Sequence, residues 1–187
     1  MTLRHMIGRI LGRKLSDKYI DHLRLIRKLG ITSLLDIPPP KAMSMKNHLP
    51  KTCKYMSVGL PGEYDELHKP DVNWNLNKYP YPFKDNSFDM VLMSHILEHI
   101  ENPPKAMTEG YRIAKRFLVI NIPTHCRINK QNARDLRHIW NYDTHHNLSQ
   151  PWGKYLPFWL RRFIAWTPAY EMRIVIEKRK EDLREYA

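Results

Sequence analysis

The chain switches repeatedly between apolar residues at helical spacing and short continuous apolar runs. The helical spacing is clearest between Ser16 and Gly30, which suit the cap and the end of a helix over residues 17–29. The expected helices cover residues 3–15, 17–29, 42–49, 96–100 and 103–115. The apolar runs between them predict strands over residues 31–37, 54–58, 71–76, 88–94, 116–122 and 172–177.

Strands that alternate with helices indicate a three-layer, Rossmann-like α/β fold, with helices on both faces of a mostly parallel central sheet. At 187 residues, the chain suits a single domain with a sizeable core. We expect N-terminal helices over residues 1–30, βα units over 31–123, and a variable region with the last strand over 124–187. The pattern weakens after Pro123, so the sheet is expected to be shortened at its C-terminal end.

The rest of the chain is organised around residues 73–100. In this stretch two prolines and an Asp-Asn-Ser turn lead into the apolar run 88–94, which opens directly into an expected helix. The run is nearly all apolar, as is typical of a strand that is covered on both faces. Doubly wound α/β folds place their ligand site where such a strand ends and a helix begins. The sequence therefore predicts a site near Ser94 and His95.

Residues 82–123, PFKDNSFDMVLMSHILEHIENPPKAMTEGYRIAKRFLVINIP, resemble the class I S-adenosylmethionine-dependent methyltransferases. The resemblance is closest to the type 11 branch, in which a PF-dnsFD turn precedes the fourth strand and LEH follows it. It covers residues 31–123 in order and is specific from Asn75 onwards. The resemblance implies S-adenosylmethionine as the cofactor and methyl transfer to an acceptor that the sequence does not identify.

The resemblance also implies positions for the cofactor and for catalysis. The implied cofactor-binding residues are Asp36, Pro38, Pro40, Gly59, Asn75, Leu76, Ser94 and His95. Asp36 stands at the family's first-strand acid, and Asn75 and Leu76 stand where the adenine is met. Methyl transfer is an in-line displacement, so catalysis is largely positioning, sometimes helped by a base. The candidate catalytic bases are His95, beside the transferred methyl group, and His125, after the fifth strand.

Two of the family's cofactor contacts are altered in this chain. The glycine-rich loop after the first strand is replaced at residues 38–40 by three prolines, which fix φ and lack N–H donors. The acid expected after the second strand is replaced by Gly59, and Glu63 is the nearest carboxylate. A milder change places Asn75 where aspartate is common. These departures leave open a non-catalytic domain of the same fold, acting as a binding or scaffold protein, including for nucleic acid.

Two other groups of residues could hold a metal. His95, Glu98 and His99 form the H-x-x-E-H pattern of inverted zinc proteases, which needs a third ligand such as Glu109 or Glu171. A second group matches no standard zinc spacing; its members are His125, Cys126, His138, His145 and His146. The methyltransferase resemblance accounts for the first pattern, so no metal is expected. The two cysteines, Cys53 and Cys126, are expected to be free thiols.

The formal net charge of +12 favours an anionic partner such as nucleic acid, acidic lipid or a phosphorylated substrate. Two basic clusters carry part of this charge, namely Arg112, Lys115 and Arg116, and Arg127, Lys130, Arg134 and Arg137. No base-reading motif accompanies either cluster, so nucleic acid stays one option beside the methyl acceptor. The oligomeric state is left open.

Two amphipathic stretches bear on membranes. Residues 3–15 could form a membrane-surface helix, a mitochondrial presequence or a helix packed on the domain. The aromatic segment 152–170 could lie on a membrane surface, wall an apolar substrate pocket or pack on the sheet. No apolar run approaches the roughly 20 residues that span a bilayer, and no signal-type segment opens the chain. A cytoplasmic protein is therefore expected.

Overall fold

The computed structural model describes residues 17–38, 45–59, 69–123, 165–167 and 171–178. Several predictions from the sequence lie outside these residues. They concern the helix over 3–15, the Ser16 cap, Pro39 and Pro40, Glu63, His125, Cys126, His138, His145, His146, the second basic cluster and nearly all of the aromatic segment. Within the described ranges, none of the helices has the length and apolar content of a membrane span.

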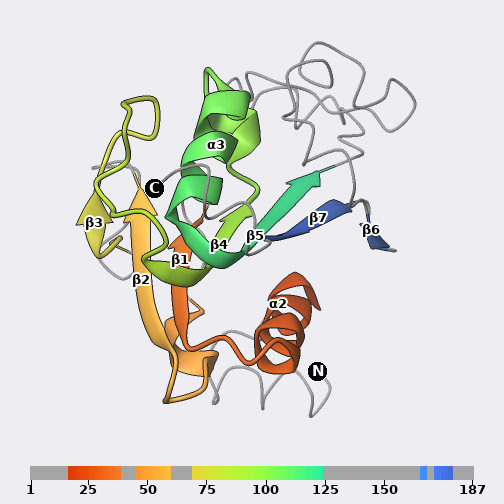
Figure 1. The fold of residues 1–187 in the computed structure, drawn as a ribbon. Coiled ribbons are helices and arrows are strands. Elements are labelled where there is room, and N and C mark those ends of the chain that lie inside the picture. Colours follow the sequence, from red (N-terminus) through yellow and green to blue (C-terminus); the bar gives the residue numbers. More distant parts are fainter. Residues whose placement is uncertain (1–16, 39–44, 60–68, 124–164, 168–170, 179–187) are drawn as a thin grey trace, which may run out of the picture.

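In the part of the chain that the structure describes, seven strands form one sheet in the order β3-β2-β1-β4-β5-β7-β6. Their bounds are β1 Ser33–Ile37, β2 Lys54–Gly59, β3 Val72–Asn73, β4 Phe88–Ser94, β5 Ala114–Pro123, β6 Ala165–Thr167 and β7 Glu171–Glu177. The first five strands run parallel, and β7 runs antiparallel to both β5 and β6 (Figure 1). The chain moves outward from β1 to β3 and returns to place β4 on the other side of β1. This reversal is the switch point of a doubly wound sheet.

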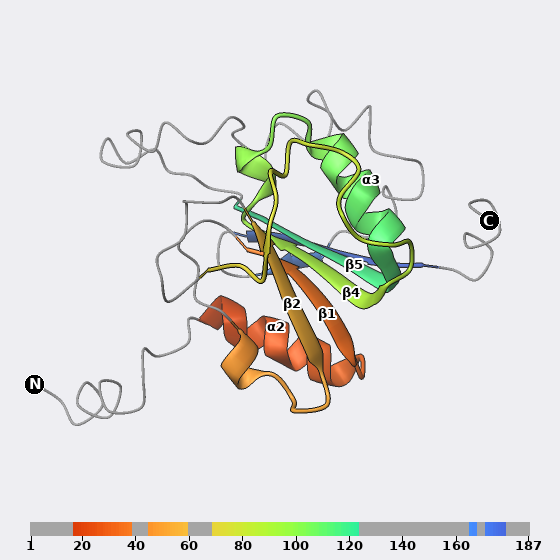
Figure 2. The ribbon, with the colours of Figure 1, turned by 90° about the vertical axis from the view of Figure 1, so that its left-hand side faces the viewer.

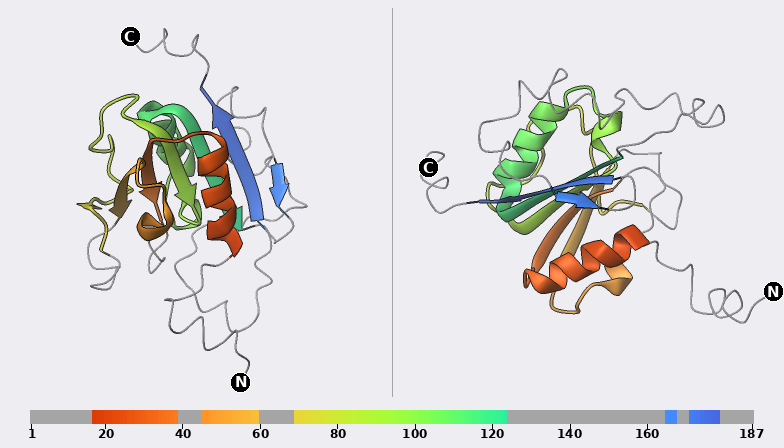
Figure 3. Two further views of the ribbon diagram at one scale, coloured as in Figure 1. Left: turned by 90° about the horizontal axis from the view of Figure 1, so that it is seen from below. Right: turned by 90° about the vertical axis from the view of Figure 1, so that its right-hand side faces the viewer.

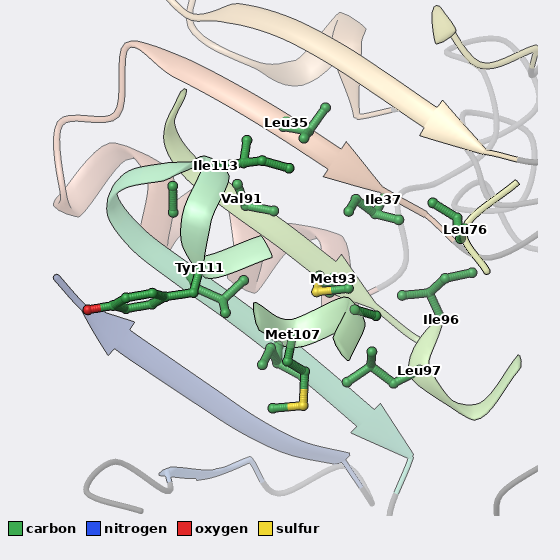
Figure 4. Packing of buried hydrophobic residues seen from close by; sticks show 14 of the residues in the cluster. Leu35, Ile37, Leu76, Val91, Met93, Ile96, Leu97, Met107, Tyr111 and Ile113 are labelled. Atoms are coloured by element: carbon green, nitrogen blue, oxygen red, sulfur yellow. The ribbon is translucent and has the colours of Figure 1, made fainter. Parts of the chain in front are cut away.

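Among the described residues, one α-helix covers each face of the sheet, which confirms the predicted three-layer fold. Helix α2, Asp17–Lys28, lies below the sheet in Figure 2 and α3, Pro103–Ile113, lies above it. The edge-on view in Figure 3 shows the same three layers. The α2 side buries a cluster formed by Ile26, Ile31, Leu34, Met45, Met90, Leu92, Phe117 and Val119. The α3 side buries a larger cluster, of which Leu35, Ile37, Val91, Met93, Met107 and Ile113 are shown in Figure 4.

The middle of strand β4, residues 90–93, is apolar because both of its faces are buried. Val91 and Met93 face α3, whereas Met90 and Leu92 face α2, and each of the four side chains is at most 1% exposed. Gly110 lets α3 approach this strand closely, because a Cβ at that position would lie 3.0 Å from both Met93 Sδ and Leu118 Cδ1. The sequence pattern therefore predicted the central strand and its burial correctly.

The ends of the two helices follow the predicted chemistry. Gly30 ends the first helix with φ of +60°, a conformation that glycine adopts without strain. Asn102 caps α3 by accepting a hydrogen bond from the Lys105 backbone N–H at 3.1 Å. Prolines 103 and 104 occupy the first helical positions, where their missing N–H groups would have no partner in any case.

Three expected elements are shorter than predicted. The helix over residues 96–100 is only a 3₁₀ turn, η2 Leu97–His99, because the chain must turn back before α3 restarts at its own cap. The strand over 71–76 is reduced to β3, because Asn75 Oδ1 accepts from the Asn77 backbone N–H at 2.9 Å and turns the chain. The helix over 42–49 is represented by the 3₁₀ turn η1 Lys46–His48, with residues 39–44 outside the described ranges.

Arg112 holds the turn that precedes β4 in place. Its guanidinium donates to the Phe83 carbonyl at 2.8 Å, the Tyr81 carbonyl at 3.1 Å and Asp85 at 2.6 Å. The same group holds Glu109, whose carboxylate also accepts from the Tyr81 backbone N–H at 2.6 Å. Arg112 thus ties this turn to α3. Internal acceptors occupy its guanidinium, and binding of an anionic partner by the cluster of Arg112, Lys115 and Arg116 stays a prediction.

Candidate functional site

The carboxyl ends of the parallel strands bring most of the predicted site residues to one edge of the sheet. Register pairs Gly59 at the end of β2 with Asn73 at the end of β3, and Ser94 at the end of β4 with Asn121 in β5. Ile37, the last residue of β1, pairs with Met93, so Pro38 lies next to the end of β4. This edge, at the switch point between β1 and β4, is where doubly wound folds bind ligands.

Asp36 lies at this edge but faces the interior. Its carboxylate is 2% exposed and accepts a hydrogen bond from the Tyr55 hydroxyl at 2.9 Å. Burial raises the pKa of Asp36 to about 7, and the Tyr55 hydrogen bond opposes that rise. The carboxyl group is therefore partly protonated at neutral pH, and its hydrogen bond is made within the sheet.

The ends of β1 and β2 place the backbone groups of Pro38 and Gly59 at this edge of the sheet. Pro38 and Gly59 are both buried, and the Gly59 carbonyl accepts from the Trp74 backbone N–H at 2.8 Å. A proline offers a carbonyl acceptor but no N–H donor. The turn after β1 thus has no backbone N–H at Pro38 to donate to a ligand.

Asn75 and Leu76 play different parts in the turn after β3. Asn75 is half-buried and shapes the turn through its side-chain oxygen, so its Nδ2 group is the part that remains for a ligand. Leu76 is 3% exposed and packs in the α3-side cluster, as Figure 4 shows, while its carbonyl accepts from the Tyr81 hydroxyl at 3.0 Å. A role in meeting adenine stays a prediction for both residues.

Ser94 and His95 form the joint at which β4 ends. Ser94 is 5% exposed, and the His95 backbone N–H donates to the Asn121 carbonyl at 2.9 Å. His95 has φ of +52°, a left-handed conformation that is uncommon for any residue except glycine and that often marks functional sites. Its imidazole Nδ1 lies 3.7 Å from Oε1 of Glu98, a carboxylate that is itself buried.

The H-x-x-E-H pattern does not form the zinc geometry that an α-helix would give it. Glu98 and His99 lie in the 3₁₀ turn η2, so residues four apart do not share a helical face. Glu109, a proposed third ligand, is bound to Arg112 and to the Tyr81 backbone. In the described part of the chain, no three His, Cys, Asp or Glu side chains gather as a metal site would require. Cys53 is a half-buried free thiol.

Three polar residues at this edge were missed by the sequence reasoning. His22 and Asn121 are buried, with His22 Nε2 and Asn121 Nδ2 2.7 Å apart, and Arg173 Nε donates to Asn121 Oδ1 at 3.1 Å. Two signals could have found them. His22 is spaced four residues before Ile26 on the buried face of α2, and Asn121 interrupts an otherwise apolar strand.

Comparison with known proteins bears on the middle of the chain. The family model described as "Methyltransferase domain", of type 11, matches residues 65–117, which span the end of the second crossover, β3, β4, α3 and the start of β5. This segment contains the joint at His95 described above. Residues 65–117 therefore resemble a methyltransferase domain. The resemblance predicted from residues 82–123 is therefore confirmed, whereas no curated protein sequence matches the chain.

Solved structures agree with this fold over most of the chain. An S-adenosylmethionine-dependent methyltransferase of Thermotoga maritima, described as a possible histamine N-methyltransferase, has a TM-score of 0.58 at 15% identity and covers 86% of this chain and 89% of its own. One from Archaeoglobus fulgidus has a TM-score of 0.57 at 13% identity, and the match covers 95% of this chain and 100% of the Archaeoglobus chain. One from Aquifex aeolicus has a TM-score of 0.55 at 13% identity, and the match covers 88% of this chain and 99% of the Aquifex chain. At these identities, the likeness establishes the methyltransferase fold.

Proposed function

We propose that this chain transfers a methyl group from S-adenosylmethionine to an acceptor. The observation that carries the proposal is the junction between β1 and β4, which are neighbouring parallel strands on either side of the switch point. The methyltransferase-domain match covers the β4 side of that junction, including Ser94 and His95. The similar structures from Thermotoga, Archaeoglobus and Aquifex are all described as S-adenosylmethionine-dependent methyltransferases, which supports the same cofactor here.

The polar groups at the carboxyl edge suit the chemistry of this cofactor. The Ser94 hydroxyl and the Asn75 amide can both donate hydrogen bonds to a nucleoside or an amino-acid group. The three prolines after β1 have no backbone N–H groups to donate to a carboxylate. When bound, S-adenosylmethionine supplies a methyl group on a sulfonium, and the contribution of the chain is to hold the acceptor in line with it.

His95 is the residue that the structure favours as a proton acceptor. The buried Glu98 carboxylate lies on its Nδ1 side at 3.7 Å, which favours the tautomer with the proton on Nδ1. Nε2 is then the atom that would take a proton from an acceptor amine or hydroxyl. His125, the other candidate base, lies outside the described residues, and its role stays a prediction.

Calorimetric titration with S-adenosylmethionine and with its demethylated product tests the proposal. We expect both to bind at micromolar concentrations. Ser94→Ala should weaken binding by about three- to tenfold, because one buried hydrogen-bonding group is removed. Ser87→Ala is the matched control, since Ser87 is exposed in the turn before β4 and its hydroxyl donates to the Lys84 carbonyl at 2.7 Å. Absence of binding up to millimolar cofactor would contradict the proposal.

One observation favours a second candidate function, a non-catalytic domain that keeps the fold. Asp36 faces the interior and is bonded to Tyr55, and proline replaces glycine at position 38, so two groups that typically grip the cofactor are altered. Such a domain would bind neither form of the cofactor. If it served nucleic acid, titration with RNA should show affinity that falls steeply as salt rises.

A further inference from the structure

A cluster of three polar side chains lies on the α2 face of the sheet, beside the ends of β4 and β5. Asn121 of β5 is fully buried and bridges His22 of α2 and Arg173 of β7. Neighbouring side chains on this face of the sheet, such as Leu92 of β4 and Val119 of β5, are apolar. Burying polar groups among apolar ones is unfavourable unless they are hydrogen-bonded, so the cluster needs an explanation beyond core packing.

The hydrogen-bonding chemistry fixes how the cluster is arranged. A guanidinium has donors only, so the Asn121 amide oxygen must face Arg173. The Asn121 amide nitrogen then faces His22, whose Nε2 must accept, because two donors cannot bond each other. His22 is therefore neutral, with its proton on Nδ1. The result is an ordered chain from α2 through β5 to β7 that sets the direction of the Arg173 side chain.

Arg173 uses only part of its hydrogen-bonding capacity in this arrangement. It is partly buried and donates through Nε to Asn121, and among the described residues it forms no ion pair and makes no hydrogen bond through its two Nη groups. An arginine without a carboxylate partner still carries its charge, and its planar fork matches a carboxylate or phosphate through two parallel hydrogen bonds. The free side of this guanidinium is thus suited to an oxyanion.

The position of Arg173 relates it to the proposed reaction centre. Asn121 is the register partner of both Ser94 in β4 and Arg173 in β7, so these three side chains share one face of the sheet. Two strand spacings separate Arg173 from Ser94, which is about 10 Å. A molecule with an anionic group on Arg173 could therefore place another of its groups beside His95.

We propose that Arg173, oriented by Asn121 and His22, binds an oxyanion, either a carboxylate or a phosphate, on the methyl acceptor. The acceptor is then a small anionic molecule, or an anionic group on a larger one, whose methylated atom lies about 10 Å from the oxyanion. Its identification as the acceptor site rests on the proposed methyl transfer. The binding of an oxyanion to Arg173 is a separate property that can be measured alone.

Nuclear magnetic resonance of ¹⁵N-arginine-labelled full chain tests the site, with acetate and inorganic phosphate as separate probes. We expect a saturable shift of the Arg173 Nε–H signal with one of them, and the probe that saturates identifies the class of oxyanion. Arg173→Lys keeps the charge but loses the fork, so affinity should fall by about tenfold. Asn121→Asp should weaken binding similarly, because its carboxylate would compete for the guanidinium. The matched control is Arg24→Gln, an exposed arginine paired with Asp21, which should leave the Arg173 response unchanged.

Two outcomes would overturn the inference. One is a linear response to both probes, and the other is an equal response from Arg24, because either would show only screening of surface charge. Calorimetry with S-adenosylmethionine on the same samples separates this inference from the proposed function. Cofactor binding without a saturable Arg173 shift would contradict the oxyanion site and leave the proposed methyl transfer standing. A saturable shift without cofactor binding would leave an anion-binding site and sink the methyltransferase proposal.

Discussion

At the scale of single residues, Asp36 makes the stability of the fold depend on pH. Burial raises its pKa to about 7, well above the value of 3.8 that it has when exposed. Between these two values the folded chain binds more protons at Asp36 than the unfolded chain does. Asp36 therefore lowers the free energy of unfolding progressively as pH rises through this window, and its stabilising contribution is fully present only below pH 4.

Replacing Asp36 with Asn should remove this pH dependence, because the amide stays neutral while its oxygen still accepts from Tyr55. The free energy of unfolding of D36N relative to the wild type should rise by roughly 2–3 kcal/mol between pH 5 and pH 8. Urea denaturation of both proteins across that range measures the difference, in which the titration of other groups cancels. A difference that is constant with pH would show that Asp36 titrates normally.

Substitutions at His95 test whether the backbone at the end of β4 has the left-handed conformation seen in the structure. Its φ of +52° suits Asn nearly as well as His, whereas a β-branched side chain is strongly disfavoured there. We expect His95→Asn to keep the stability of the wild type, and His95→Val to lose about 1–2 kcal/mol. Equal stability of the two variants by denaturant melts would contradict the left-handed conformation. Because His95→Asn keeps the fold but removes the imidazole, a loss of methyl transfer in this variant would show that the imidazole is needed for the reaction.

A site residue could be predicted where the local sequence pattern marks its position, and could not where its orientation depends on another strand. Ser94 and His95 were placed correctly at the strand end because the apolar run stops abruptly at them. The interior orientation of Asp36 could not be predicted, since it depends on Tyr55 of the neighbouring strand. Asn121 could have been predicted as a candidate site residue, because it is a polar residue in an otherwise apolar, buried strand. The family resemblance placed the candidate residues on the fourth strand instead.

At the scale of elements, Arg112 fastens α3 to the turn before β4. Arg112→Ala should lower the free energy of unfolding by roughly 2–3 kcal/mol, because it removes hydrogen bonds to two carboxylates and two carbonyls at a partly exposed site. Arg112→Lys should recover less than half of that loss, since Lys lacks the fork. Arg24→Ala is the control, with an expected change within about 0.5 kcal/mol. A loss for R112A no larger than the control would refute the fastening role.

Gly110 sets how closely α3 lies on the sheet. A single Cβ would touch only the flexible ends of Met93 and Leu118, so Gly110→Ala should be nearly neutral once its helix propensity is included. Gly110→Val adds two methyl groups against the same neighbours and should cost about 1–3 kcal/mol. Thermal melting of the two variants compares them directly. Equal stabilities would show that α3 can move away from the sheet freely.

Elements were predictable in proportion to their length and burial. The strand over residues 88–94 was predicted with its observed bounds, since seven residues with almost continuous apolar character leave little choice. The short pieces at residues 71–76 and 96–100 were predicted wrongly, because local hydrogen bonds of Asn75 and the cap at Asn102 outweigh weak apolar patterns. The three-residue β6 fell within the aromatic segment, whose pattern indicated no strand.

At the scale of the whole molecule, the fold depends on the chain returning from β3 to place β4 beside β1. That reversal gathers residues from distant parts of the sequence, Asp36, Gly59, Asn75 and Ser94, at one edge of the sheet. The resemblance of residues 82–123 to a known family supplied this topology. The polar cluster around Asn121 joins the same edge from a helix and from the antiparallel strand. His22 and Asn121 each carry a local signal, but their contact with each other and with Arg173 depends on the topology of the sheet.

The central claim is that this edge binds the methyl donor, and mapping the binding site by nuclear magnetic resonance tests it most directly. Backbone amide shifts are followed while the demethylated cofactor is added to ¹⁵N-labelled chain. The account predicts saturable shifts concentrated at Gly59, Asn75 and His95, and little change at Thr32 and Lys54 near the opposite ends of the strands. No shift at millimolar ligand, or shifts that gather away from the carboxyl edge, would contradict it.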